Sequence, residues 1–137
     1  MSDAIADLLF EIRAFIDDVN AGNVSGALAR LTNDVCIVED LAPFRWTGAD
    51  AGGEWLAAMA ANAQRLGMTT ITMVPGEPRR IEVNTEHGYC VIPGQVKLEG
   101  PDSNLDEDGL ITFAIRLENG QWRISALTWT GDPPTAA

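Results

Sequence analysis

A β-hairpin signal near the C-terminus is the feature that most constrains the fold. Two apolar, β-branched runs, residues 110–117 and 122–130, flank the dipeptide Asn119-Gly120. Asn-Gly favours the positive φ angles that a tight hairpin turn needs, so both runs are predicted to form neighbouring antiparallel strands. The side chains of the first run alternate between two faces: Ile111, Phe113, Ile115 and Leu117 share one face, and Leu110 and Ala114 share the other.

A strand that is apolar on both faces belongs to a sheet that needs a cover on each side. We expect helices to cover one face of the sheet. We expect a second copy of the chain to cover the outer face, which would make the protein a homodimer.

The helices are predicted to precede the sheet. Over residues 3–20 apolar side chains recur at spacings of three and four, the pattern of an amphipathic helix, and Phe15 lies on this stripe. Ser2 or Asp3 can cap its start, and Gly22 can end it in the left-handed conformation.

Two further helices are expected. A short one is predicted over residues 24–31, with Leu28 and Leu31 buried. An Ala-rich one is predicted over residues 49–66, ended by Gly67, with Gly52-Gly53 weakening its first turn. Its inner stripe comprises Trp55, Leu56, Met59 and Leu66.

Four more strands complete the prediction: residues 34–40, 68–74, 79–84 and 89–98. The acidic segment 100–108 is expected to be a solvent loop whose carboxylates serve solubility, and residues 131–137 a frayed tail. Helices followed by a run of strands indicate an α+β architecture. A chain of 137 residues fits one domain, residues 1–137.

Charge narrows the classes of ligand. Nine basic residues against 20 acidic ones give a formal charge of −11. Nucleic acids and anionic membrane surfaces are therefore disfavoured as partners, while uncharged or cationic small molecules and proteins remain admissible. The N-terminal residues lack the basic and apolar regions of a signal peptide, and we expect a cytoplasmic protein.

The segment 31–48 carries the main candidate for chemistry. Its β-branched run ends in two adjacent acids, Glu39 and Asp40, and a Pro-broken loop with Phe44 and Trp46 follows. Strand alternation predicts that only one of the two acids points inward. A carboxylate that is shielded from water by aromatic rings would have a raised pKa and could act as a general base. A strand cap and a solvated turn are the alternative interpretation.

Three pieces, taken in order, resemble the nuclear transport factor 2-like superfamily, in its SnoaL-like and ketosteroid-isomerase-like branch. They are residues 20–23 at the end of the first helix, residues 33–40 as the first strand, and residues 119–124 in the last hairpin. The resemblance covers residues 5–131. It implies a cone-like curved sheet, antiparallel or mixed, that is wrapped by three helices and holds a pocket, often in a dimer.

The resemblance places the general base of ketosteroid isomerases at Asp40. In that family a Tyr and a protonated Asp hold the developing enolate oxygen. The corresponding positions here are Phe15 and about Thr112. Phenylalanine cannot donate a hydrogen bond, and losing one such donor costs about 3–4 kcal/mol of transition-state stabilisation. Steroid isomerisation by the family's mechanism is therefore not expected.

Substrate contacts are predicted from mostly apolar and aromatic side chains: Phe15, Phe44, Trp46, Trp55, Met59, Thr112 and Trp129. Core packing is the alternative role for Trp55. No metal site is expected, because His87 is the only histidine and the acids of segment 100–108 lack the spacing of a calcium loop. No organic cofactor is expected either.

Two functions remain open. The first is an isomerase, cyclase or hydratase-type enzyme that acts on a small apolar or polycyclic compound, with Asp40 as base and Trp46 or Thr112 as its polar partner. The second is a dimeric module of the same fold that binds an apolar ligand or a protein without catalysis. The surroundings of Asp40 discriminate between them.

Overall fold

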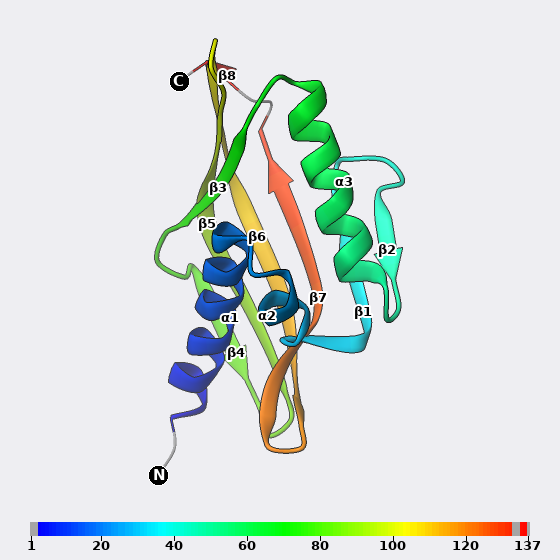
Figure 1. Cartoon of the computed structure of the whole chain (residues 1–137). Helices are drawn as coiled ribbons and strands as arrows, with labels where there is room; N and C mark the ends of the chain where they lie inside the picture. The colour runs from blue at the N-terminus through cyan, green and yellow to red at the C-terminus, as the bar shows by residue number, and fades with distance from the viewer. Residues whose placement is uncertain (1–2, 133–134, 137) are drawn as a thin grey trace.

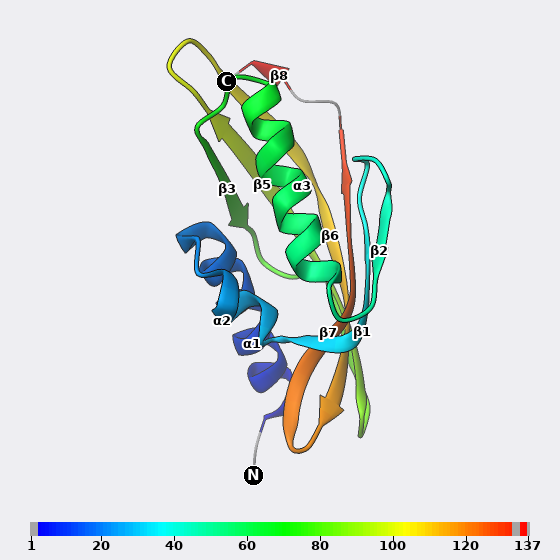
Figure 2. The ribbon, with the colours of Figure 1, turned by 45° about the vertical axis from the view of Figure 1, so that its right-hand side comes forward.

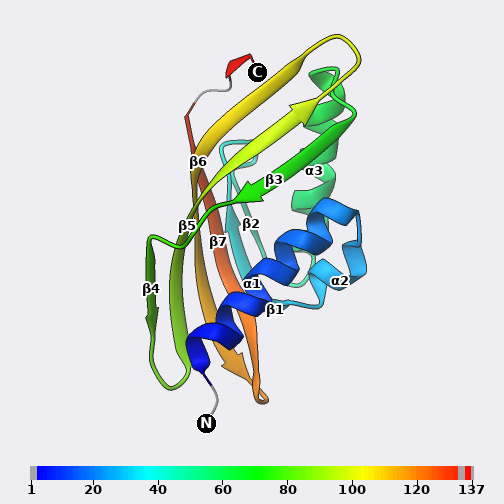
Figure 3. The same cartoon turned by 90° about the vertical axis from the view of Figure 1, so that its left-hand side faces the viewer.

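The computed structural model describes residues 3–132 and 135–136. Three helices lie on one side of a curved, mixed β-sheet of eight strands (Figures 1 and 3). The helices are α1 (Ala4–Ala21), α2 (Val24–Leu28) and α3 (Ala51–Arg65). The α+β prediction is thereby confirmed. Within the described residues, no helix combines the length and the apolar character needed to cross a membrane.

Helix α1 forms as its sequence predicts. The Asp3 carboxylate accepts hydrogen bonds from the backbone N–H groups of Ile5 and Ala6 and so caps the first turn. Gly22 ends the helix with a φ of 73°. The apolar stripe packs against the sheet and includes Phe15, which is 2% exposed.

The other two helices differ from the prediction at their ends. Helix α2 stops at Leu28, because Leu31 already belongs to the first strand. Leu28 is 36% exposed, so its predicted burial was wrong. Leu66 is 46% exposed because it lies past the last turn of α3, as its C-cap. Gly52 is buried, and a Cβ there would overlap the side chains of Leu28 and Leu31. This glycine therefore permits the close approach of α3 to α2.

The strands are β1 (Leu31–Val38), β2 (Arg45–Thr47), β3 (Thr70–Pro75), β4 (Arg80–Val83), β5 (His87–Glu99), β6 (Asn104–Glu118), β7 (Gln121–Gly131) and β8 (Thr135–Ala136). Their order in the sheet is β2-β1-β7-β6-β5-β3, with β4 also paired to β5 and β8 to β6. Strands β1 and β7 run parallel, and the other pairs are antiparallel. Strand β1 thus lies beside β7, and β2 forms the edge of the sheet next to it (Figure 2).

The predicted hairpin is confirmed. Asn119 and Gly120 have φ angles of 51° and 79°, and they join β6 to β7. On the inner face of β6, Ile111, Phe113 and Ile115 are at most 7% exposed. The residues between them face outward and are half-buried. The expected homodimer through this outer face stays a prediction.

The observed strands correct the sequence analysis at several points. Strand β1 spans residues 31–38 rather than 34–40, so both acids lie beyond its end. Strand β2 was not predicted. Strand β6 begins at Asn104 because the whole length of β5 pairs with it, so most of the expected solvent loop is a strand. Of the expected frayed tail, Gly131 ends β7 and residues 135–136 pair with β6, while residues 133, 134 and 137 lie outside the described residues.

Candidate active site

A cavity of about 130 Å³ lies between helices α1 and α3 and the inner face of the sheet. Its walls are mostly apolar, and its lining comprises Phe15, Ile16 and Val19 of α1; Trp55, Met59 and Asn62 of α3; Glu39, Asp40 and Leu41 after β1; and Ile71, Met73, Val96, Leu98, Glu107, Ile111 and Trp129 of the sheet. A cavity of ~150 Å³ can hold one benzene ring. The cavity therefore suits a ligand built on about one ring.

Glu39 enters this cavity directly after strand β1. Its carboxylate accepts a hydrogen bond from the indole nitrogen Nε1 of Trp55 at 3.2 Å. Burial raises the pKa of Glu39 to about 7, and the neighbouring Asp40 and the charge of Glu107 add to the rise, while the bond from Trp55 opposes it. Glu39 is therefore partly protonated and partly ionised near neutral pH.

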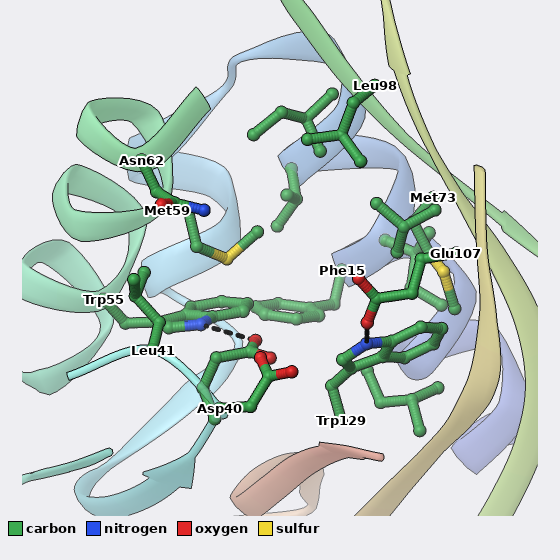
Figure 4. A pocket seen from close by; sticks show the side chains of 16 residues that line it. Phe15, Asp40, Leu41, Trp55, Met59, Asn62, Met73, Leu98, Glu107 and Trp129 are labelled. Carbon is green, nitrogen blue, oxygen red and sulfur yellow. Dashed lines mark hydrogen bonds between the residues drawn. The ribbon is translucent and has the colours of Figure 1, made fainter. Parts of the chain in front are cut away.

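Glu107 reaches the same cavity from strand β6. Its Oε1 atom accepts a hydrogen bond from Nε1 of Trp129 at 2.5 Å. Burial raises the pKa of Glu107, and the negative charges of Asp40 and Asp132 act in the same direction, against the bond from Trp129. Figure 4 shows Trp55 and Asp40 on one side of the cavity and Glu107 with Trp129 on the other.

The paired strands make room for this second carboxylate. Gly131 of β7 lies opposite Gly109 of β6. A Cβ at Gly131 would overlap both the Glu107 carboxylate and the indole nitrogen of Trp129. The missing side chain at this position therefore leaves space for the hydrogen bond between Trp129 and Glu107.

Comparison with known proteins was informative only for structure. No protein-family model and no curated protein matched the sequence. A scytalone dehydratase-like protein of Novosphingobium aromaticivorans superposes with a TM-score of 0.79 at 10% identity, covering 97% of this chain and 87% of that one. The hexachlorocyclohexane dehydrochlorinase LinA-type3 of Novosphingobium barchaimii gives 0.75 at 13% identity, covering 98% and 88%. A protein of unknown function with a cystatin-like fold from Nostoc punctiforme gives 0.73 at 12% identity, covering 96% and 94%.

The fold is nuclear transport factor 2-like. The resemblance that the sequence suggested is confirmed at the level of the fold, including the curved sheet and the three helices. Sequence identities of 10–13% show a shared fold and do not show a shared activity. The chemistry of this cavity therefore depends on its own residues.

The two adjacent acids are arranged differently from the sequence prediction. Alternation was expected to send one acid inward and the other to solvent, but both line the cavity, because β1 ends at Val38 and residues 39–40 are not in a strand. Asp40 is exposed and Glu39 is only partly so. A turn follows, in which the Phe44 N–H donates to the Leu41 carbonyl. The role of Asp40 as a base stays a prediction, and the raised pKa belongs to Glu39.

Four of the seven predicted substrate contacts line the cavity: Phe15, Trp55, Met59 and Trp129. The other three do not. Phe44 is 58% exposed on the turn, and Trp46 is buried in the core, where β2 pairs with β1. Thr112 faces outward, because it lies between the inward-facing Ile111 and Phe113. The aromatic shielding of the acids comes instead from α1, α3 and β7.

Sequence reasoning missed Glu107, which it placed in a solvent loop. A usable signal was present, because Leu105, Glu107, Gly109 and Ile111 continue the period-two pattern of the inner face of β6 toward the N-terminus. Asn62 was missed as well. Among the described residues that line the cavity there is no Lys, Arg or His. Nor does the described part of the chain place three or more His, Cys, Asp or Glu side chains where they could hold a metal ion.

Proposed function

We propose that the protein is a small-molecule enzyme of the isomerase, cyclase or hydratase type, in which Glu39 is the general base. The observation that carries this proposal is a desolvated carboxylate with a pKa of about 7 in an apolar cavity that also holds a second carboxyl group, Glu107. A general base whose pKa lies near the working pH is substantially ionised and still has a high affinity for the proton.

The first chemical step would be proton abstraction from carbon. The ionised Glu39 takes a proton from a carbon beside a carbonyl or beside a carbon with a leaving group. The electron pair of the broken C–H bond forms a C=C bond, while the carbonyl π pair moves to its oxygen or the leaving group departs with its bonding pair. In an isomerisation, the same proton returns to a different carbon. The indole N–H of Trp55 holds Glu39 in place during both steps.

Glu107 would supply the acid when a group leaves. Burial raises the pKa of Glu107, which favours the protonated form, and in that form it can pass its proton to a departing oxygen. Glu39 then carries the proton taken from carbon, and exchange with water resets both groups. In the hydration direction, the two carboxyl groups exchange these roles.

One observation favours the alternative, a binding protein without catalysis. Both indole N–H groups in the cavity already donate to carboxylates, so neither is free to stabilise an oxyanion. Asn62 is the one uncharged amide in the lining, and its side-chain carbonyl accepts from Arg65. If the Asn62 N–H₂ group does not reach the substrate oxygen, the cavity would bind its ligand and leave it unchanged.

Hydrogen–deuterium exchange on 2-indanone tests the proposal without knowledge of the natural substrate. This ketone carries one aromatic ring and has acidic hydrogens beside its carbonyl. In D₂O at pH 7.5 we expect the protein to accelerate deuterium incorporation, measured by proton NMR, and Glu39→Gln to reduce the acceleration by about 10²-fold or more.

Two further variants sharpen the same test. Glu86→Gln makes the same chemical change on an exposed turn and should leave the rate unaltered. Asp40→Asn distinguishes the two adjacent acids. A loss of rate in Asp40→Asn that exceeds the loss in Glu39→Gln would show that Asp40 is the base. Wild-type protein that exchanges no faster than buffer would favour the binding alternative.

A further inference from the structure

We propose that the cavity selects organic cations, with an apolar body of about one ring and a positively charged nitrogen centre. The proposal rests on the function proposed above, because it names the substrate class of the same cavity. The ligand would bind in this cavity. The carboxylates and aromatic rings that line it, and its volume, determine which ligands fit.

Charge is the first argument. Every charged side chain in the lining is a carboxylate: Glu39, Asp40 and Glu107. These three groups come from two different walls. The charges of Asp40 and Glu107 raise the pKa of Glu39, and the charge of Asp40 raises the pKa of Glu107. An anionic ligand would add to this repulsion, and a neutral ligand would leave it uncompensated. A cation relieves it, and the effect is large because apolar surroundings screen charges weakly.

The aromatic walls are the second argument. The rings of Phe15, Trp55 and Trp129 line the cavity together. Phe15 and Trp55 stack with a centroid distance of 6.3 Å and an interplanar angle of 11°, so they form one continuous wall (Figure 4). Aromatic faces attract a cation by about 0.5–2 kcal/mol, more strongly when water is excluded. Because the two indole N–H groups are occupied, the remaining property that these rings offer to a ligand is their π surface.

Access to the cavity favours the same ligands. Asp40 is the exposed member of the three acids that line the cavity, so its carboxylate faces both the solvent and the binding site. The whole chain carries a formal charge of −11. Such a field concentrates cations near the protein and accelerates their entry.

Binding of a cation should be linked to the ionisation of Glu39. The groups that face this carboxyl are Asp40 beside it, Glu107 from β6, and the indole N–H of Trp55 from α3. A bound cation favours the ionised form, so its affinity should rise as the pH rises through about 7. Binding at pH 7 should therefore release protons.

A series of three benzyl ligands tests the proposal, because the ring stays the same and the charge changes. Isothermal titration calorimetry at pH 8 would compare benzyltrimethylammonium, benzyl alcohol and benzoate. We expect the cation to bind at least about tenfold more tightly than the alcohol, and benzoate to show no binding. At pH 5.5 the preference for the cation should shrink, and the affinity for the alcohol should not change.

Variants complete the test. Glu39→Gln should weaken binding of benzyltrimethylammonium by about tenfold and leave benzyl alcohol unaffected, while the exposed control Glu86→Gln should alter neither. Equal affinities for the cation and the alcohol, or no binding of the cation, would overturn the proposal. Exchange on the neutral 2-indanone reports on proton transfer separately, so failure of the cation preference can be told from failure of the proposed enzyme.

Discussion

At pH 8, Glu39→Gln is expected to be about 2–3 kcal/mol more stable than the wild type, and at pH 4 the two proteins should have nearly equal stability. The pKa of Glu39 is 4.5 in its ordinary environment and about 7 in the folded protein. The folded state therefore holds a proton that the unfolded state releases, and stability falls as the pH rises from about 4.5 through about 7. At about 1.4 kcal/mol per pKa unit, burying the ionised form costs up to about 3 kcal/mol. Glutamine avoids this cost.

Urea unfolding of the wild type, Glu39→Gln and Glu86→Gln at several pH values measures the effect. Glu86 is exposed, so its substitution controls for the loss of one negative charge from a chain of net charge −11. The amide in Glu39→Gln can still accept the bond from Trp55, so the comparison at pH 4, where the carboxyl is mostly protonated in both states, serves as a baseline. If the wild type and Glu39→Gln showed parallel pH dependences, the carboxyl would not be desolvated.

Trp55→Ala is expected to destabilise the protein by about 3–5 kcal/mol, the range for removing a large buried aromatic side chain. Trp55 is 5% exposed, stacks on Phe15 and donates to Glu39. Trp55→Phe separates these contributions, because it keeps a ring against Phe15 and removes the N–H donor. Since the bond from Trp55 lowers the pKa of Glu39, this variant should raise that pKa above the wild-type value.

Trp46→Ala provides the matched control. Trp46 is 6% exposed but lies in the core outside the cavity lining. It should therefore cost a similar free energy of unfolding and leave the ionisation of Glu39 unchanged. Denaturant unfolding gives the first quantity, and an NMR titration gives the second. A shift of the Glu39 pKa in Trp46→Ala, or none in Trp55→Phe, would contradict the assigned contact.

Elements whose signals are local could be predicted from the sequence. Helix α1 carries its own cap at Asp3 and its own stop at Gly22, and the hairpin carries its own turn at Asn119-Gly120. Together with the segment 33–40 between them, these pieces were enough to predict the α+β class and the nuclear transport factor 2-like fold. The hydrogen-bond partners of several strands lie far away in the sequence, as for β1 and β7, so strand ends were predicted less well.

The site depended on such distant partners. Glu107 belongs to a strand only because β5 extends far enough to pair with it. Glu39 does not follow the alternation of a strand, because β1 ends at Val38, directly before it. The contact between Trp55 and Glu39 depends on how α3 lies over the curved sheet, and no local sequence pattern encodes that placement. The sequence located the pair of acids, and the structure distinguishes the partly buried Glu39 from the exposed Asp40.

Carbon-13 NMR of protein labelled at the glutamate side-chain carboxyl carbons would measure the ionisation of Glu39 directly, with Glu39→Gln assigning its signal. A titration from pH 3 to pH 9 should place its midpoint near 7, well above the ordinary value of 4.5. A midpoint near 4.5 would contradict both the desolvation of Glu39 and its proposed role as the base.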